Sequence, residues 1–318
     1  NDLTPFPIDM SFKGRDVVSI REFSRQDIEH ILDVAREMLP IAEGKKKSNM
    51  LGSYVLSTFF YEPSTRTRLS FQSAICRLGG RYIGFADPNV TSARKGETLA
   101  DTAKMAEAYS DAMVLRHPHE GSARLAAEFC SKPVINAGDG AGQHPTQTML
   151  DLFTIREELG AICGKTVAMV GDLKYGRTVH SLSYALAMFG AKLIFVAPKE
   201  LQMPKEIIDR LNAQGAELKN TTKLDDAVKE ANALYVTRIQ RERFPDPNEY
   251  QRVAGTYQVN AELLKDAGEK LIVMHPLPRV TEISPDVDHT KHALYFKQAF
   301  YGVPVRMALL ALVLGEVD

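Results

Sequence analysis

Short apolar runs alternate with amphipathic helical segments along almost the whole chain. This alternation is typical of α/β proteins, in which helices cross over between parallel strands. The strands predicted in the first half are 53–60, 81–85, 112–116 and 133–136. Those predicted in the second half are 166–170, 192–197, 216–219, 233–237 and 271–274. The expected fold class is therefore α/β, with a parallel β-sheet flanked by helices in each half.

Helical patterns lie between these strands. They cover 24–39, 64–78, 97–109 and 120–130, and then 177–189, 204–214, 223–230 and 260–267. With 318 residues, 44% of them hydrophobic, the chain is large enough for two domains. A helix at 145–159 is expected to bridge the halves, and the apolar helix that ends the segment 292–314 is expected to return to the first half. We therefore place 1–144 and 293–318 in one domain and 145–292 in the other.

Charge and cysteine content exclude several classes of protein. A net charge of −1 gives no overall basic field, so neither nucleic acid nor an anionic membrane is an expected partner. No apolar run approaches the roughly 20 residues that span a bilayer, and the start lacks a signal-peptide pattern. Cys76, Cys130 and Cys163 are too few and too scattered for a disulfide framework or a zinc site. We expect a soluble cytoplasmic protein without a metal ion.

The stretch from Phe59 to Arg68 predicts an anion site. An apolar strand ends in a proline turn, and Ser64 is placed to cap the helix that follows. Free backbone amides, the positive end of the helix dipole, the hydroxyls of Thr65 and Thr67, and Arg66 then converge on one point. Cations in a first turn oppose the dipole and lower stability by roughly 0.3–1 kcal/mol each unless an anion is present. This locally unfavourable choice indicates a functional site, with phosphate as the expected ligand.

Two loops carry further candidates. The glycine-rich loop 136–147 ends at a helix start, where His144 and Gln147 are three residues apart and can face the same side. A flexible interdomain hinge is the alternative interpretation of this loop. The loop 87–98 carries Lys95, which is either a mobile phosphate ligand or an ordinary solvated lysine.

In the second half, polar groups again follow predicted strands. The segment 171–177 lacks the G-x-G-x-x-G spacing of a dinucleotide site, so a carboxylate bound by Arg177 fits better than a nucleotide cofactor. Strand alternation puts Arg238 and Gln240 on one side of the chain. The segment 275–278, His-Pro-Leu-Pro, predicts a rigidly held backbone, for which a cis peptide is one option.

All these clusters share one position, because each follows the carboxyl end of a predicted strand, where open α/β sheets bind ligands. Two such edges facing each other would form one active-site cleft between the domains. The cations expected there are Arg66, Lys95, Arg116, Arg177 and Arg238. They indicate a phosphorylated electrophile and an acidic nucleophile. Since the sequence shows no Ser-His-Asp set and no paired carboxylates, we expect one substrate to attack the other while the protein positions them and stabilises charge.

Several motifs together resemble the transcarbamoylase family. They are Ser64-Thr65-Arg66-Thr67-Arg68, His144-Pro145-Thr146-Gln147 and His275-Pro276-Leu277-Pro278-Arg279. The segments 171–181 and 238–240 resemble the aspartate branch of this family, and the match runs in order over nearly the whole chain. Ornithine-specific members carry a cysteine where this chain has Pro276, and they have a Ser-Met-Gly segment that is missing here.

The resemblance implies an enzyme of pyrimidine biosynthesis that carbamoylates L-aspartate with carbamoyl phosphate and needs no cofactor. By this resemblance, the phosphate is held by Ser64, Thr65, Arg66, Thr67, Ser92 and Lys95. The carbamoyl oxygen is polarised by Thr67, Arg116 and His144, and the carbamoyl amino group is held by Gln147 and the carbonyls of Leu277 and Pro278. The residues expected to act in catalysis are Arg66, Thr67, Lys95, Arg116 and His144. Either the departing phosphate or His144 accepts the amine proton, and the sequence does not choose between them.

The same resemblance implies how aspartate and other chains are bound. The aspartate ligands are Lys95, Arg177, Arg238, Gln240 and Leu277. Ser92 and Lys95 match a mobile loop that reaches into a neighbouring subunit's site, so a homotrimer with shared sites is the expected active unit. Separate regulatory chains are compatible with the resemblance, and the sequence leaves their binding open.

Two alternatives stay open at this point. One is a transcarbamoylase for another amine acceptor, against which the segment 238–240 and the missing Ser-Met-Gly segment argue. The other is a non-catalytic transcarbamoylase-like scaffold, which the completeness of the expected site disfavours. A nucleotide-dependent dehydrogenase is disfavoured by the missing glycine fingerprint.

Overall fold

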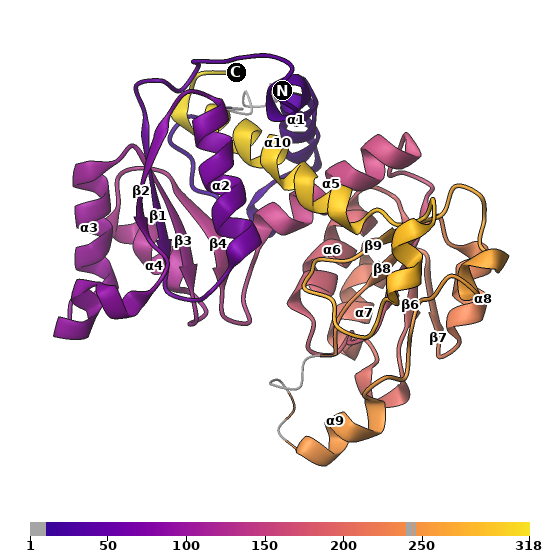
Figure 1. Cartoon of the computed structure of the whole chain (residues 1–318). Helices are drawn as coiled ribbons and strands as arrows, with labels where there is room; N and C mark the ends of the chain where they lie inside the picture. Colours follow the sequence, from indigo (N-terminus) through magenta and orange to yellow (C-terminus); the bar gives the residue numbers. More distant parts are fainter. Residues whose placement is uncertain (1–10, 240–243, 245) are drawn as a thin grey trace, which may run out of the picture. The chain divides into compact units, whose positions relative to one another are not determined.

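The computed structural model describes residues 11–239, 244 and 246–318 and divides the chain into two compact units (Figure 1). We call Asn1–Gly142 with Val303–Asp318 unit 1, and Gln143–Gly302 unit 2. Each unit has its own parallel β-sheet. The predicted α/β class is therefore confirmed.

The described part of unit 1 forms a four-stranded parallel sheet in the order β2-β1-β3-β4. The strands are β1 (Val55–Phe60), β2 (Arg81–Phe85), β3 (Ala112–His117) and β4 (Val134–Asp139). They lie where the apolar runs predict them. Because β1 pairs with β3, Phe60 lies beside Arg116 at the carboxyl edge of the sheet. This register brings Arg116, near the end of β3, next to the start of the predicted anion site.

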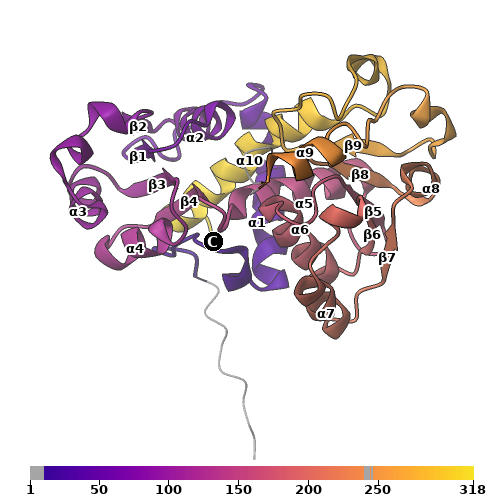
Figure 2. The same cartoon turned by 90° about the horizontal axis from the view of Figure 1, so that it is seen from below.

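Helices cover both faces of this sheet. They are α1 (Arg25–Ala42), α2 (Thr65–Arg77), α3 (Leu99–Tyr109) and α4 (Ser122–Phe129), with 3-10 turns η1 (Ile20–Glu22), η2 (Pro88–Val90) and η3 (Ser92–Lys95). Figure 2 shows α3 and α4 on one face and α2 on the other. Met113 and Leu115 are two residues apart in β3, so their side chains lie on the same face of the sheet. They are buried there with Ala103 and Ala106 of α3 and Ala126 of α4.

The described residues of unit 2 form a five-stranded parallel sheet in the order β7-β6-β5-β8-β9. The strands are β5 (Thr166–Val170), β6 (Lys192–Val196), β7 (Leu218–Thr221), β8 (Ala233–Val236) and β9 (Ile272–Met274). Strand β7 begins two residues later than its pattern predicts. The neighbours β5, β8 and β9 end at one edge, so the loops that follow them lie close together.

The helices of unit 2 agree with the patterns in all but two places. They are α5 (Pro145–Leu159), α6 (Arg177–Met188), α7 (Lys205–Ala213), α8 (Leu224–Glu230) and α9 (Pro247–Val253), with 3-10 turns η4 (Lys199–Leu201), η6 (Leu263–Asp266) and η7 (Pro285–His289). The prediction of a helix at 260–267 was wrong, because only the short turn η6 forms there. Helix α9 was missed, although the side chain of Asp246 caps it and Pro247 opens it.

The apolar helix α10 (Tyr295–Leu314) belongs to both units, since its residues from Val303 onward group with unit 1. By length and composition alone α10 could cross a membrane, but 78% of its apolar window is buried inside the structure. Such burial is typical of a core helix in a soluble protein. In unit 1, Arg306 of α10 donates to Ser70 Oγ (3.0 Å) and lies over the ring of Phe71.

Candidate active site

The start of α2 has the character of an anion site. Ser64 occupies the N-cap position of this fully described helix, yet its hydroxyl makes no capping hydrogen bond. The first turn carries Thr65, Arg66 and Thr67 and no acidic residue. Partial burial of the Arg66 guanidinium lowers its pKa, because desolvation disfavours the charged form. A bound anion would satisfy the free amides and offset this cost.

Arg116 is held beside this helix start by two acceptors. Its Nε donates to Glu62 Oε2 (3.0 Å) and its Nη1 to the carbonyl of Ala137 (3.0 Å). Gly138 has φ +115°, and a Cβ there would lie 2.4 Å from Arg116 Nη1. The guanidinium therefore packs where only a glycine leaves room. Sequence reasoning missed Glu62, although it lies within the same motif.

Ser92 and Lys95 lie on η3, in the loop before α3, and both are solvent-exposed. The side chain of Thr91 caps this turn, and Gly96 ends it with φ +89°. The structure therefore places both residues on an exposed surface of unit 1.

In unit 2, the predicted loop residues open α5. His144 is buried at the N-cap position, and its carbonyl accepts from the Gln147 N–H (3.1 Å). The side chain of Gln147 is half-buried, and its Nε2 donates to Asp151 Oδ1 (2.9 Å). Sequence reasoning missed Asp151, although its spacing of four residues from Gln147 places both side chains on one helix face.

The arginines of unit 2 follow neighbouring strands. Arg177 begins α6 after β5, and its first turn carries no acidic residue. Arg238 follows β8, which pairs with β5. Both side chains are half-buried, and the parallel register brings their backbones to one edge of the sheet. Gln240, the third predicted carboxylate ligand, lies outside the described residues.

The turn after β9 has an unusual backbone. The Leu277–Pro278 peptide is cis, and Leu277 has φ +58°. A non-glycine residue in this region costs of order 1–3 kcal/mol and persists only where its surroundings hold it. Here His275 Nδ1 accepts from the Leu277 N–H (2.7 Å), and His275 Nε2 bonds to Glu282 Oε1 (2.7 Å). The predicted rigid turn is therefore present.

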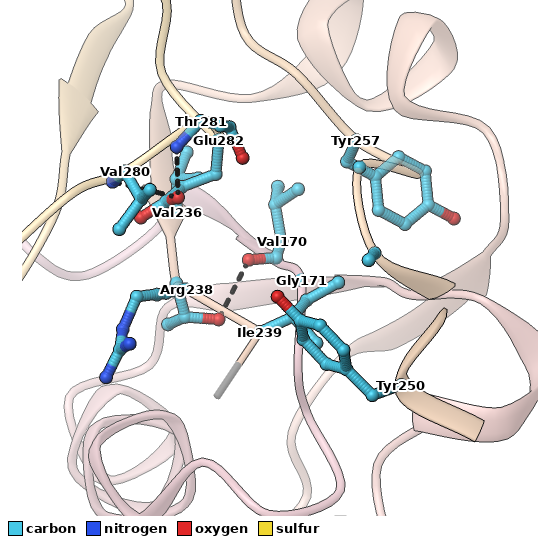
Figure 3. A pocket seen from close by; sticks show the side chains of 13 residues that line it. Val170, Gly171, Val236, Arg238, Ile239, Tyr250, Tyr257, Val280, Thr281 and Glu282 are labelled. Carbon is cyan, nitrogen blue, oxygen red and sulfur yellow. Dashed lines mark hydrogen bonds between the residues drawn. The ribbon is translucent and has the colours of Figure 1, made fainter. Parts of the chain in front are cut away.

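A pocket of about 180 Å³ lies beside Gly171 in unit 2. In Figure 3, Tyr250 and Tyr257 form one side of it, and the segment 280–282 lies across from them. The guanidinium of Arg238 points away from both tyrosines. Arg238 lines the pocket, but its guanidinium points away from the side that the tyrosines form.

Some of the predicted residues lie together within each unit. In unit 1, Ser64 to Thr67 and Arg116 lie at the joined ends of β1 and β3. In unit 2, Arg177, Arg238 and Leu277 follow the adjacent strands β5, β8 and β9. Across the described residues, no three His, Cys, Asp or Glu side chains cluster as metal ligands would. What the two groups can do is bind anions and orient polar atoms.

Comparisons with known protein families agree with this arrangement. Residues 15–157 match the model of the aspartate/ornithine carbamoyltransferase carbamoyl-P binding domain. Residues 163–313 match the model of the Asp/Orn binding domain of the same family. The chain therefore belongs to the aspartate/ornithine carbamoyltransferase family, a class of carbamoyl-transferring enzymes.

Individual relatives place the chain more narrowly. It is 58% identical to the aspartate carbamoyltransferase catalytic subunit of Thermococcus kodakarensis, over 96% of this chain and 99% of the relative. It is 59% identical to that of Methanothermobacter thermautotrophicus, over 95% of this chain and 96% of the relative. The predicted aspartate branch of the family is therefore confirmed.

Solved structures agree with these relatives. The catalytic subunit of M. jannaschii aspartate transcarbamoylase has a TM-score of 0.88 at 52% identity, covering 93% of this chain and 96% of that one. Aspartate transcarbamoylase from Trypanosoma cruzi, in complex with carbamoyl phosphate and aspartate, has a TM-score of 0.90 at 40% identity, covering 95% of this chain and 98% of that one. The two-sheet architecture is thus the one found in this branch of the family.

Proposed function

We propose that this chain transfers the carbamoyl group of carbamoyl phosphate to the amine of L-aspartate, which gives N-carbamoyl-L-aspartate and phosphate for pyrimidine biosynthesis. The observation that carries the proposal is the start of α2, where free amides, hydroxyls and Arg66 meet without an acidic residue. That arrangement suits the phosphate of the carbamoyl donor.

Charge stabilisation drives the chemical step. The leaving phosphate is bound by Ser64, Thr65, Arg66 and Thr67, with Ser92 and Lys95 as further ligands. The amine of aspartate attacks the carbamoyl carbon, the bond from that carbon to the phosphate oxygen breaks, and the departing phosphate or His144 accepts the proton that the amine loses. Arg116, Thr67 and His144 stabilise the oxyanion that forms in between. The ion pair with Glu62 (3.0 Å) supports this role, because it fixes the Arg116 guanidinium.

The remaining ligands select the substrates. Gln147 and the carbonyls of Leu277 and Pro278 accept hydrogen bonds from the carbamoyl amino group. Arg177, Arg238, Gln240 and Lys95 bind the aspartate carboxylates, together with the backbone of Leu277. The half-buried positions of Arg177 and Arg238 support this role, since partial desolvation strengthens charge-assisted hydrogen bonds.

We assign carbamoyl phosphate to the domain 1–144 with 293–318, and aspartate to the domain 145–292. The order of the two matching family models supports this assignment. The active unit is a cytoplasmic homotrimer in which Ser92 and Lys95 enter a neighbouring subunit's site. In its support, the edge strand β2 exposes Tyr82 and Ile83, and exposed apolar edge strands are sites of association. Several relatives are named catalytic subunits, which agrees with separate regulatory chains.

A direct assay tests the acceptor. The purified chain is incubated with carbamoyl phosphate and either L-aspartate or L-ornithine, and the carbamoylated product is measured. Product with aspartate alone is the expected result. Turnover with ornithine would overturn the roles of Arg177, Arg238 and Gln240. No turnover with either amine, in a chain shown to be folded, would favour a non-catalytic scaffold.

A further inference from the structure

A buried carboxylate lies directly behind one of the proposed substrate ligands. Asp151 of α5 is fully buried, and its Oδ1 accepts from Gln147 Nε2 (2.9 Å). The same carboxylate accepts from Tyr235 Oη (2.7 Å) and from Gln298 Nε2 (2.7 Å). These donors come from α5, β8 and the part of α10 that belongs to unit 2. Asp151 therefore joins elements that are far apart in the sequence.

Gln298 extends this connection to the turn after β9. It is buried in α10, and its Oε1 accepts from the backbone N–H of His275 (2.9 Å). His275 Nδ1 in turn accepts from the N–H of Leu277 (2.7 Å). A continuous path of hydrogen bonds thus runs from the side chain of Gln147 through Asp151, Gln298 and His275 to Leu277. Both ends of this path are groups that the proposed function assigns to the carbamoyl amino group.

We propose that Asp151 and Gln298 are positioning residues that hold the acceptors for the amino group of carbamoyl phosphate, an inference that rests on the proposed function. An ionised carboxylate can only accept hydrogen bonds, so Asp151 takes the amide N–H of Gln147. The Gln147 Oε1 is then the atom left to accept from the substrate. Gln298 holds the backbone N–H of His275, and through His275 it fixes the turn that carries the Leu277 and Pro278 carbonyls.

The surroundings of Asp151 agree with a carboxylate. The side chains of Gln147, Tyr235 and Gln298 all direct donors at it, which a carboxylate satisfies with its two oxygens. Burial raises the pKa of Tyr235 well above its usual value, and the charge of Asp151 adds to this effect. Tyr235 therefore remains a neutral donor. Without the carboxylate, the Gln147 amide could turn and present its own NH₂ to the substrate's NH₂.

The positioning role has a consequence that a purely structural role does not have. It acts on the amino group of carbamoyl phosphate, so it discriminates against acetyl phosphate, in which a methyl group replaces that amino group. Such a site prefers carbamoyl phosphate because its acceptors pair with the N–H groups of the substrate. It loses this preference over acetyl phosphate when the acceptors are displaced. A general loss of order in unit 2 would instead weaken the binding of carbamoyl phosphate and of acetyl phosphate to the same extent.

The test uses Asp151→Asn and Gln298→Met, which keep side-chain size and act from two different helices. The kcat/KM for carbamoyl phosphate and the inhibition constant of acetyl phosphate are measured for each folded variant. We expect kcat/KM to fall by about tenfold or more, while the inhibition constant changes less than about threefold. Tyr301→Phe is the matched control, since it removes another hydrogen bond between the same two helices, from Tyr301 of α10 to Glu158 of α5. The control should stay within about twofold of wild type in both measurements.

Three results would contradict the inference. Parallel losses for both compounds would indicate a structural role only. An unchanged kcat/KM in either folded variant would show that the path does not position the acceptors. If the wild-type chain binds neither compound, the proposed function itself fails and this inference fails with it. The first two results, obtained beside an active wild type, would overturn this inference and leave the proposed function standing.

Discussion

At the scale of single residues, a carboxylate fixes a key group in each unit. Glu62 holds the Arg116 guanidinium (3.0 Å) in unit 1, and Glu282 holds the His275 ring (2.7 Å) in unit 2. The second oxygen of Glu282 accepts from the N–H groups of Val280 and Thr281 (3.1 Å each). Glu282 thereby secures the left-handed Leu277 through His275. Both carboxylates therefore hold an expected substrate ligand, Glu62 directly and Glu282 through His275, and neither is itself an expected ligand.

Glu282 makes the stability of unit 2 depend on pH. Burial opposes ionisation of Glu282, but hydrogen bonds from His275 and nearby backbone N–H groups outweigh it and lower its pKa. The folded state therefore gains stability above the pKa of an unfolded glutamate, about 4.3, and loses it as the pH falls through the lower folded pKa. We expect Glu282→Gln to lower the free energy of unfolding at pH 7 by about 1–3 kcal/mol.

The measurement is the thermal midpoint of wild type and Glu282→Gln between pH 7 and pH 3. The difference between the two proteins should shrink below about pH 4, because the wild-type carboxyl then becomes neutral as well. A difference that stays constant over this range would show that ionised Glu282 does not stabilise the turn.

At the scale of secondary-structure elements, helix starts and strand ends define the candidate site. Helices α2 and α6 both carry an arginine and no acidic residue in the first turn. This choice opposes the helix dipole, so it lowers stability unless an anion binds. Strand β4 contributes differently, because its Gly138 leaves room for the Arg116 side chain.

Gly138→Ala should disturb the site from within β4. The new Cβ would lie 2.4 Å from Arg116 Nη1, and the φ of +115° is strained for alanine. We expect the guanidinium to shift away from the Ala137 carbonyl and kcat to fall by about tenfold or more, because an oxyanion donor is misplaced. Steady-state kinetics with carbamoyl phosphate and aspartate measure this change.

Gly121→Ala is the control for this experiment. Gly121 also has a positive φ, +85°, but its Cβ would meet nothing within 4 Å. It should lower the thermal midpoint through backbone strain and leave kcat within about twofold of wild type. Equal losses of kcat in both variants would contradict a specific role for Gly138.

At the scale of the whole molecule, the exposed residues of unit 1 bear on assembly. Strand β2 lies at the edge of its sheet with Tyr82 and Ile83 exposed, and Val90 is exposed in the loop that follows. Lys95 is exposed in the same loop. An exposed cation beside an apolar edge suits the proposed trimer, in which Lys95 serves a neighbouring subunit.

Mixing two inactive variants tests the shared site. Arg66→Ala and Lys95→Ala trimers should each have less than about 1% of wild-type activity, because each removes a cation from the reacting phosphate. After subunit exchange, a mixed cyclic trimer combines an intact Arg66 and an intact Lys95 in one of its sites. Random mixing in equal amounts should restore roughly a quarter of wild-type activity. No recovery after proven exchange would show that each site is built from one chain.

Much of the fold follows from local patterns. The strands and most helices were predicted within a few residues, because side-chain periodicity and helix caps depend on near neighbours. The prediction for the segment 260–267 was wrong: only the short turn η6 forms, although the side chain of Asn260 accepts from the Leu263 N–H (2.8 Å) as a helix cap would. The roles of the predicted site residues remain predictions, and Gln240 lies outside the described residues.

The alternating pattern, the anion site at the start of α2 and the family motifs are properties of the sequence alone, because helix dipoles, caps and motifs act over a few neighbouring residues. The supporting contacts are different. Asp151 and Gln298 are 147 residues apart, and no local pattern relates them. Their hydrogen bond exists only because α5 and α10 pack together and exclude water. Such long-range partners depend on the packing of the whole chain, so the tertiary structure alone decided them.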